Sequence, residues 1–441
     1  MTRYAPHNLV AVLILTAVAP GSARTQEAQD SEAYAPIAWP SQPPASCPFP
    51  PSEDVAGMTF TGRHREYTMA DCWNPSWASD GNLYSCYSDG AVENVLPDGS
   101  VELVHAIGNK VANVAQLKRD DADNGVGKIV GDDPLDLTVT ALPPVKTPVG
   151  PYHSRYPSGS LVHDGIWYYG THPEGPGGAG PFTGFLVSRD LGLTWTGGRN
   201  DATDPLFPTT EPFLDEEGLP TYVPVRIVEP FFVDFGKNQE HSPDGKAYLL
   251  AHGSTQPADG EAHHGSHWHI GDQAYLLRVT PSPETINDEA AYEFFGGHDG
   301  EGQPLWTSKR AEMKPLFEWG GHVGPTTMVW NPGLQRFLAC AVVGETGEGQ
   351  HGRYDTYLLE SEAITGPWKL VVYMEHFGEQ GYFVNVPSKF LSEDGRTAWL
   401  CYAANFGIGV TPTLKSIPPG SRYAMNLHEF RLGRAAADTK D

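Results

Sequence analysis

Short apolar runs separated by tight turns recur along this chain of 441 residues. The clearest example spans residues 240–253, where the letters S-P-D-G at 242–245 predict a turn. Asp can bond its own backbone two residues on, and Gly supplies the positive φ that such a turn needs. The apolar stretch 246–250 predicts a strand after this turn, and residues 231–233 predict its partner before the turn. The pattern therefore predicts a β-hairpin.

The same strand–turn–strand pattern returns at residues 78–84, 162–168 and 391–400, and in weaker form at 329–338. The turns recur at intervals of roughly 80 residues, shortening to about 60, and such self-similarity is typical of a repeat architecture. We expect an all-β fold, a five-bladed β-propeller whose ring is closed by a strand near Met58-Thr59-Phe60. A seven-bladed ring stays the alternative, if residues 108–150 and 296–320 hold two further blades.

The two ends of the chain differ from the repeats. Residues 1–23 predict a cleaved signal peptide, with Arg3, an apolar run of 11 residues at 9–19, and small residues at 21–23. That run is too short to span a bilayer. Residues 24–55 are polar and Pro-rich and predict a linker or N-terminal arm, 56–433 the propeller, and 434–441 a disordered tail. We expect a secreted or periplasmic monomer with no membrane span.

Composition narrows the class of protein. The chain holds 49 Gly, 39 Pro and 11% aromatic residues, a mix typical of turn-rich β proteins. Its formal charge of −25 disfavours nucleic acid and anionic membranes, because phosphate binding needs a basic face. The cysteine count of five is odd, and Cys86, Cys340 and Cys401 occupy similar places after repeat turns. We interpret these three as small buried hydrophobic residues and expect no disulfide framework.

Polar and aromatic side chains stand before the first strand of each unit, where a propeller gathers them at one mouth of its channel. Aromatic rings stack on pyranose faces, and Asn or Arg can bond hydroxyls or a carboxylate. The sequence therefore predicts a carbohydrate site, and each candidate also has a plain structural alternative as a turn cap or local ion-pair partner. The predicted substrate-binding residues are Trp73, Asp133, His153, Arg155, Tyr156, Arg226, Glu379 and Asn385.

Two motifs carry a resemblance to known families. The letters S-R-D-L-G-L-T-W at 188–195 resemble the Asp-box turn of sialidases, which is structural and says nothing of substrate. The repeated strand–Asp-Gly–strand units, Asp71 before the first strand and G-P-W at 366–368 resemble the five-bladed glycoside hydrolases of the arabinanase/β-xylosidase and neoagarobiose-hydrolase types.

The resemblance to the arabinanase/β-xylosidase type implies three roles. Asp71 would be the general base, Asp132 or Asp133 a second Asp that tunes a pKa, and Glu229 or Glu240 the general acid. The neoagarobiose-hydrolase type implies a His as acid, which suits His241. Glycoside hydrolysis needs two groups with separated pKa values on either side of the scissile bond. We therefore predict Asp71 with Glu240 or His241 as the catalytic residues.

Three functions remain open at this point. The first is a secreted glycosidase acting on a plant or algal polysaccharide. The second is a polysaccharide lyase, in which His153, Tyr156 or His241 removes a proton and Arg155 or Arg226 neutralises a uronate carboxylate. The third is a non-catalytic carbohydrate-binding propeller.

No cofactor is expected to be required, and no metal ligand set is predicted. The histidines in H-H-G-S-H-W-H at 263–269 leave a transition-metal site, a substrate contact or a solvated loop as alternatives. A structural Ca²⁺ in the channel is a further alternative, because ring centres gather carbonyl and Asp or Asn oxygens.

Overall fold

A computed structural model describes residues 33–108, 121–152, 154–175, 178–209, 224–256, 267–344, 352–405 and 416–434. Nearly all regular structure in these ranges is β. The helical elements among them are single 3-10 turns: η1 (Lys237–Gln239), η2 (Glu289–Ala291), η3 (Arg310–Glu312) and η5 (Ser388–Phe390). None of the helices in the described part of the chain is long and apolar enough to cross a bilayer.

Within the described ranges the strands form five antiparallel sheets, which follow one another along the chain. The first contains β3 (Met69–Asp71), β4 (Ser76–Trp77), β5 (Leu83–Val95), β6 (Val101–Ala106), β7 (Asp121–Val130), β8 (Thr138–Ala141) and β9 (Val145–Pro148). The second contains β10 (Ser154–His163), β11 (Ile166–Gly175), β12 (Gly178–Ala179) and β13 (Gly184–Ser188).

The third sheet contains β14 (Phe231–Phe232), β15 (Ala247–Gly253), β16 (Gln273–Val279), β17 (Glu293–His298), β18 (Pro304–Thr307) and β19 (Phe317–Glu318). The fourth contains β20 (Thr326–Asn331), β21 (Arg336–Gly344), β22 (Tyr354–Ser361) and β23 (Lys369–Met374). The last contains β24 (Tyr382–Asn385), β25 (Thr397–Ala403) and β26 (Met425–Arg434), to which β2 (Val55–Tyr67) and β1 (Ile37–Ala38) add from the start of the chain.

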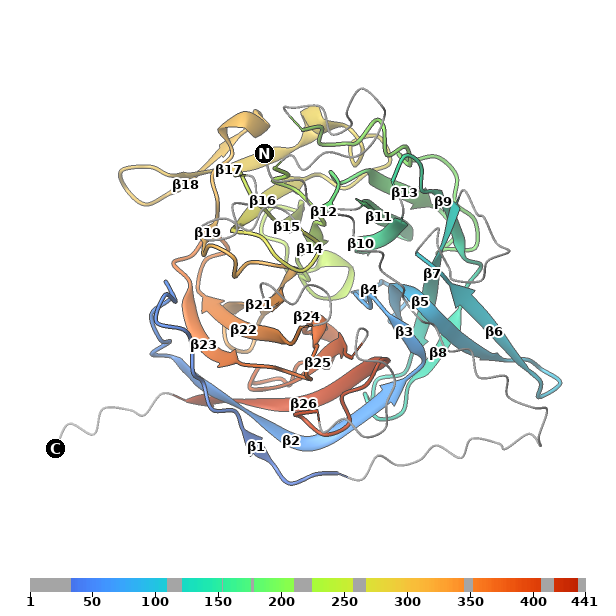
Figure 1. Ribbon diagram of the computed structural model, residues 1–441, viewed down its shortest axis with the longest axis horizontal. Helices are drawn as coiled ribbons and strands as arrows, with labels where there is room; N and C mark the ends of the chain where they lie inside the picture. Colours follow the sequence, from blue (N-terminus) through green and yellow to red (C-terminus); the bar gives the residue numbers. More distant parts are fainter. Residues whose placement is uncertain are drawn as a thin grey trace, which may run out of the picture.

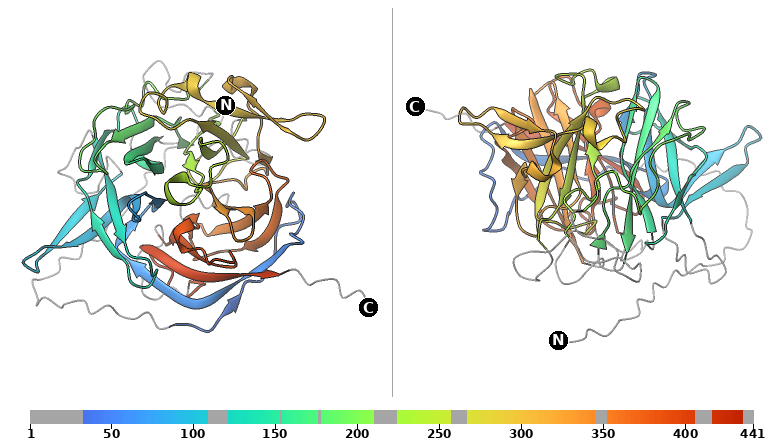
Figure 2. Two further views of the ribbon diagram at one scale, coloured as in Figure 1. Left: turned by 180° about the vertical axis from the view of Figure 1, so that it is seen from behind. Right: turned by 90° about the horizontal axis from the view of Figure 1, so that it is seen from above.

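The sheets surround a central axis, so the fold is a β-propeller. Figure 1 looks down this axis, with β4, β10, β14 and β24 nearest the centre and β6, β18 and β23 near the rim. Figure 2 shows the ring from behind and from above, where the long strands stand side by side. An all-β propeller is therefore confirmed.

The ring is closed by the two ends of the described chain. Strand β2 pairs with β26, and Met58 lies opposite Leu432 and Phe60 opposite Phe430. The strand predicted near residues 58–60 is therefore correct in place and partner. This pairing covers the edge of β26, which would otherwise present free backbone groups to solvent. Part of the predicted N-terminal arm also packs on the ring, because β1 pairs with β2 and Phe49 is buried.

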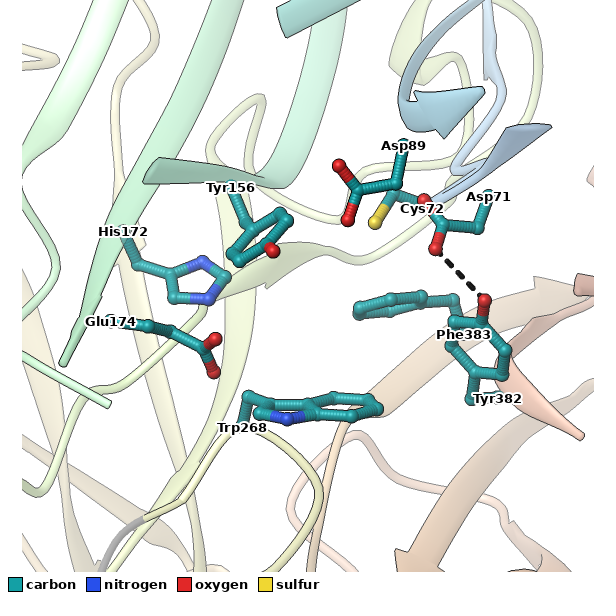
Figure 3. Close-up of a pocket in the computed structure, with 9 residues that line it drawn as sticks. All are labelled: Asp71, Cys72, Asp89, Tyr156, His172, Glu174, Trp268, Tyr382 and Phe383. Atoms are coloured by element: carbon teal, nitrogen blue, oxygen red, sulfur yellow. Dashed lines mark hydrogen bonds between the residues drawn. The ribbon is translucent and has the colours of Figure 1, made fainter. Parts of the chain in front are cut away.

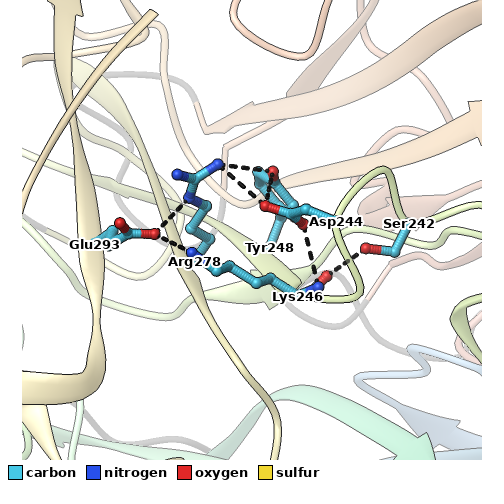
Figure 4. A network of polar contacts seen from close by, with 6 residues as sticks. All are labelled: Ser242, Asp244, Lys246, Tyr248, Arg278 and Glu293. Atoms are coloured by element: carbon cyan, nitrogen blue, oxygen red, sulfur yellow. Dashed lines mark hydrogen bonds and ion pairs between the residues drawn. The ribbon is translucent and has the colours of Figure 1, made fainter.

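The predicted hairpins form. Phe231 lies opposite Leu250 across the turn at 242–245, and Asp244 Oδ1 accepts the backbone N–H of Lys246 at 3.1 Å. The outer side of this hairpin carries a network of paired charges (Figure 4), in which Arg278 Nε lies 2.8 Å from Glu293 and Lys246 also contacts Glu293. The Arg278 guanidinium covers the Trp306 ring at 3.9 Å. Its charge and its planar face are both used.

Apolar residues of neighbouring sheets pack between the blades. One cluster joins β2, β14 and β20–β26 and includes Cys340, Phe377 and Phe430. All five cysteines are free thiols; Cys86, Cys340 and Cys401 are buried, as predicted for small core residues. The predicted signal peptide and most of the predicted tail lie outside the described residues.

Candidate active site

A cavity of about 80 Å³ lies at the ends of the inner strands, where several sheets meet (Figure 3). Asp71 ends β3, Asp89 lies on β5, Tyr156 on β10, and His172 and Glu174 on β11. Residues far apart in the chain therefore share one enclosed space. The lining residues are Asp71, Cys72, Asp89, Tyr156, His172, Glu174, Trp268, Tyr382 and Phe383.

The carboxyl group of Asp71 is held by two tyrosine hydroxyls. Its Oδ2 accepts hydrogen bonds from the Tyr382 hydroxyl at 2.8 Å and the Tyr423 hydroxyl at 3.1 Å. Its Oδ1 is buried and has no nitrogen or oxygen partner in the described part of the chain. Burial, followed by the nearby Asp89, raises the pKa of Asp71 to about 7, although the two tyrosines and the Cys72 thiol act in the opposite direction. One oxygen is thus anchored and the other is left for chemistry.

Asp89 stands next to Asp71 on the same side of the cavity (Figure 3). Its Oδ1 accepts the backbone N–H of Gly108 at 2.8 Å, and its carboxyl group bonds the Tyr156 hydroxyl. Burial raises the pKa of Asp89 despite these bonds. Two carboxyl groups this close disfavour joint ionisation, so Asp71 and Asp89 titrate as a coupled pair.

Glu174 faces these two carboxyl groups from across the cavity (Figure 3). It comes from β11, near the end of the strand that begins after the turn at Asp164-Gly165. Its Oε1 is buried without a hydrogen-bond partner among the described residues. Burial, followed by Asp89, raises the pKa of Glu174 to about 8, so its carboxyl group stays protonated at neutral pH.

A second glutamate lies behind this wall. Glu229 precedes β14 and is fully buried, with its Oε2 at 3.8 Å from His172 Nδ1 and its Oε1 at 4.0 Å from His252 Nε2. Burial and then Glu174 raise the pKa of Glu229 well above its ordinary value. Burial lowers the pKa of His172 to about 3, so this ring is neutral and does not form an ion pair with Glu229.

Aromatic rings form the rest of the wall. The Trp268 ring is stacked on Phe383 with centroids 6.0 Å apart and 26° between planes, and Figure 3 shows its face turned to the cavity. The Tyr156 ring lies 6.2 Å from that of His172. Aromatic faces opposite carboxyl groups suit a ligand with apolar ring faces and polar edges, which is the character of a sugar.

The structure brings two of the predicted residues, Asp71 and Tyr156, to this cavity. The prediction that Glu240 or His241 lies opposite Asp71 is wrong as a matter of position. Both side chains follow β14, whereas Glu229 precedes it, and they line a different cavity with Ser388 and Lys389. The short inner strand β14 runs from the end of the ring near Asp71 to the opposite end. Glu240 and His241, which follow β14, therefore lie at the end opposite Asp71.

Three further candidates are held inside the protein by neutral partners. Trp73 is fully buried and stacks on Tyr87 at 5.2 Å, so its faces are not open to a sugar. Asn385 is buried and donates to the Trp73 carbonyl oxygen at 2.9 Å. Arg155 is fully buried; its guanidinium donates to Pro148 O at 2.7 Å and Thr183 Oγ1 at 3.0 Å, and burial lowers its pKa to about 10.

The remaining candidates do not line the cavity. Asp133 is exposed and caps a turn through the Leu135 N–H at 3.0 Å, which is the structural alternative. Arg226 is half-buried and donates to the carbonyl of Ala311 at 3.5 Å. Glu379 forms an ion pair with Arg353 at 2.8 Å. His153 lies outside the described residues.

Of the histidine-rich stretch, only residues 267–269 are described. The His267 and His269 rings lie 4.3 Å apart, and burial lowers the pKa of His267 to about 4. Among the described residues no group of three or more His, Cys, Asp or Glu side chains could hold a metal ion.

Sequence reasoning missed Asp89, His172 and Glu174 as site residues. A signal was present in the long strands that begin after the Asp-Gly turns at 80–81 and 164–165, because polar residues follow their apolar first halves. Asp89 lies in the middle of one strand, and His172 and Glu174 lie in the second half of the other. A strand that starts at one end of the ring brings such later residues towards the other end.

The comparisons with known proteins give fold neighbours only. No family description matches the chain, and no curated protein matches it. Among solved structures, it is similar to a GH43_1 enzyme from Xanthomonas citri, with 14% identity, 83% of this chain and 88% of that chain covered, and a TM-score of 0.41. It is also similar to the catalytic domain of a GH62 alpha-L-arabinofuranosidase from Coprinopsis cinerea, with 11% identity, 91% of this chain and 98% of that chain covered, and a TM-score of 0.40. A third similar structure is a family 117 glycoside hydrolase from Zobellia galactanivorans, with 13% identity, 88% of this chain and 93% of that chain covered, and a TM-score of 0.39.

Proposed function

We propose that this protein is a glycoside hydrolase that cleaves a neutral plant or algal polysaccharide or oligosaccharide at the cavity around Asp71. The observation that carries the proposal is the pair of carboxyl groups on facing walls, Asp71 and Glu174, whose pKa values are raised to about 7 and about 8. Two carboxyl groups on facing walls of one cavity are what both stereochemical courses of glycoside hydrolysis require.

In the proposed mechanism Glu174 is the general acid. Its protonated carboxyl group gives its proton to the glycosidic oxygen as the bond to the anomeric carbon breaks. Asp71 is the ionised partner, and its free Oδ1 takes a proton from the attacking water. The Tyr382 and Tyr423 hydroxyls hold Oδ2 and favour the ionised form. Trp268 supplies the ring face against which the sugar lies.

Glu229 is the competing general acid, because the resemblance to glycoside hydrolases implies that position. Glu174 is preferred because it lines the cavity, whereas Glu229 is fully buried behind His172. In this assignment Glu229 is a neutral buried residue beside His172.

A lyase is less well supported. A lyase that acts next to a uronic acid needs a cation to neutralise the carboxylate, and the described lining of the cavity includes neither Lys nor Arg. Arg155, the predicted clamp, is engaged by neutral oxygens. A pure binding protein would not need paired carboxyl groups with raised pKa values.

We further propose that each of the five sheets is one blade and that residues 188–195 form an Asp-box turn. Asp190 Oδ1 accepts the Thr194 backbone N–H at 2.8 Å, and the Trp195 ring packs 5.4 Å from that of Trp167, which supports the second point. Export through the predicted signal peptide and a monomeric state remain part of the proposal.

The test is a screen of neutral and uronic-acid-containing polysaccharides read for new reducing ends and for ultraviolet-absorbing unsaturated products, with Asp71→Asn as the control variant. We expect reducing ends without absorbance, and a loss of at least about 1000-fold in kcat for Asp71→Asn. Activity should rise as pH increases through the pKa of Asp71 and fall through that of Glu174, with an optimum between about pH 7 and 8. Full activity of a folded Asp71→Asn variant, or an absorbing product, would overturn the proposal.

A further inference from the structure

A second cavity lies at the other end of the inner strands and has a volume of about 350 Å³. Its lining comes from residues that end or follow β4, β14, β20 and β24. The first cavity is lined instead by residues at the end of β3, within β5, β10 and β11, and at the start of β24, together with Trp268. The chain passes from Tyr382 at the first cavity, along β24, to Ser388 and Lys389 at the second. The two cavities therefore occupy opposite ends of the ring.

Two indole rings from different sheets border this second cavity. Trp77 ends β4 and Trp330 lies on β20, and both are half-buried. The indole Nε1 of Trp77 is a buried donor without a hydrogen-bond partner in the described ranges. Trp330 is supported from behind by Phe337, whose ring centroid lies 4.8 Å away. Aromatic rings at the wall of a cavity suit a ligand with apolar faces.

Polar side chains line the same cavity. Glu240, His241 and Glu393 are exposed, and Ser392 is half-buried. Glu240 Oε1 lies 4.0 Å from His241 Nε2, so the two groups stand together at the wall. Carboxylates accept hydrogen bonds from hydroxyl groups, and an imidazole can both donate and accept. Of these residues, Glu240 and His241 were predicted from the sequence as catalytic partners of Asp71, which lies at the other end of the ring.

The charges of the cavity decide which ligand class fits. Among the described residues of this lining, Lys389 alone is a lysine or arginine. Its ammonium group already contacts Gly131 O at 2.6 Å, Gly81 O at 2.8 Å and Asp132 at 2.9 Å. An anionic sugar would face Glu240 and Glu393 without a free cation. An organic cation would meet these two carboxyl groups, and the choline titration separates that case from a neutral sugar. A neutral sugar needs no counter-charge and can form hydrogen bonds to these side chains through its hydroxyl groups.

We propose that this second cavity binds a neutral sugar unit of a polysaccharide, as a secondary binding site at the far end of the ring from Asp71. The choice of ligand class rests on the proposed glycoside hydrolase function, whereas the existence of a binding site rests on the cavity alone. Such a site would keep the protein on a polymer while another part of the same polymer reaches the first cavity, which raises the effective concentration of substrate.

The experiment is isothermal titration of the Asp71→Asn protein with xylotetraose, cellotetraose and agarotetraose, with tetragalacturonate and choline as charged controls. The same titrations are run on Asp71→Asn combined with Trp330→Ala. Trp306→Ala is the matched control, since Trp306 is half-buried on the outer strand β18. If Trp330→Ala fails to fold, His241→Ala at an exposed position replaces it.

We expect at least one neutral tetrasaccharide to bind, with affinity reduced at least about 10-fold by Trp330→Ala and unchanged by Trp306→Ala. Sugar binding that does not respond to Trp330→Ala or His241→Ala would overturn the second site and leave the proposed hydrolase intact. Trp330-dependent binding of tetragalacturonate or choline alone would overturn the neutral-sugar assignment. Trp330-dependent binding of a neutral sugar, with no product from the unmodified protein in the polysaccharide screen, would keep the second site and overturn the hydrolase.

Discussion

Two groups of charged side chains in this protein behave in opposite ways. Around Arg278, each charge has a partner: Glu293 at 2.8 Å and Asp244 at 3.2 Å share its guanidinium (Figure 4). Burial disfavours the Glu293 carboxylate, but the contacts with Lys246 and Arg278 outweigh it and lower the pKa of Glu293. Around the first cavity, Glu174 and Glu229 have buried oxygens without hydrogen-bond partners in the described residues, and the pKa values of both are raised.

The difference separates groups that stabilise the fold from groups suited to chemistry. A paired, half-exposed charge gains from folding, and its carboxylate form is favoured. A buried carboxyl group without a partner is disfavoured as an anion, so it keeps a proton that it can give to a substrate. Buried unpartnered carboxyl groups lower the stability of the folded state at neutral pH, and proteins retain such groups mainly where function needs them.

The largest expected effect concerns the two glutamates near the cavity. We expect Glu174→Gln to lower kcat by about 100- to 10,000-fold on substrates with poor leaving groups, because the proton donor is lost. Substrates with activated aryl leaving groups should be affected much less, since they do not need the proton. Glu229→Gln preserves the neutral form and should lower kcat by less than about 10-fold.

The measurement is kcat for both variants with a matched pair of good and poor leaving groups. If Glu229→Gln shows the larger, leaving-group-dependent loss, the acid role moves from Glu174 to Glu229. Nearly equal kcat in both variants and the unmodified protein would remove glutamate acid catalysis altogether.

The next effect concerns the tyrosines that hold Asp71. Removing the Tyr382 hydroxyl takes away a 2.8 Å bond to the ionised carboxylate, so Tyr382→Phe should raise the pKa of Asp71 further. The acidic limb of the kcat/KM profile then moves to higher pH, with a loss of about 10-fold at pH 6 that shrinks at pH 8.

Tyr423→Phe is the matched comparison. The Tyr423 hydroxyl lies 2.6 Å from the Asp89 carbonyl oxygen and 3.1 Å from Asp71 Oδ2, so its single proton is shared between two acceptors. We expect the same direction and a smaller shift of the limb. A uniform loss at every pH, with no movement of the limb, would mean that the tyrosines act on structure and not on the ionisation of Asp71.

The raised pKa of Glu174 also predicts a gain in stability when this residue is replaced by Gln. Above about pH 4.5 the unfolded chain releases the Glu174 proton, while the folded protein retains it up to about pH 8, so this group lowers stability as pH rises through that window. Glu174→Gln has no proton to release. We expect its Tm to equal that of the unmodified protein at pH 4 and to exceed it by about 2–4 °C at pH 8.

Thermal unfolding followed by circular dichroism at both pH values measures this difference. A lower Tm of Glu174→Gln at pH 8 would show that the folded protein stabilises the Glu174 carboxylate, which contradicts a raised pKa for this group.

The smallest effect belongs to the paired charges. Arg278→Lys keeps the charge but loses the planar group that covers Trp306 at 3.9 Å and bonds Glu293. We expect a destabilisation of about 1 kcal/mol, because half-exposed ion pairs and cation–π contacts are each modest. Chemical denaturation in low and in 1 M salt measures it, and kcat should stay unchanged. An effect on kcat would link the hairpin at 242–245 to the cavity and weaken the contrast between the two regions.

Much of the fold was readable from local pattern. The Asp-Gly turns, the strands on either side of them and the closing strand at residues 58–60 all lie where the sequence predicts. Turn residues and the alternation of apolar and polar side chains act over a few neighbouring residues, so they can be recognised in the sequence itself. The hydrophobic character of Cys86, Cys340 and Cys401 was legible for the same reason.

The site was readable only in part. Asp71 and Tyr156 lie in the cavity, but Trp73, Arg155 and Asn385 have the right chemistry and are buried among neutral partners. Residue type does not say which way a side chain faces, and a mouth residue differs from a core residue by one step along a strand.

The sequence alone settled that this chain builds repeated hairpins around a ring, because each hairpin is coded by its own few residues. Which end of the ring each loop reaches was decided only in three dimensions. Glu240 and His241 went to one end while Glu174 joined Asp71 at the other, because antiparallel strands send consecutive loops to opposite ends and the pKa values depend on neighbours hundreds of residues away.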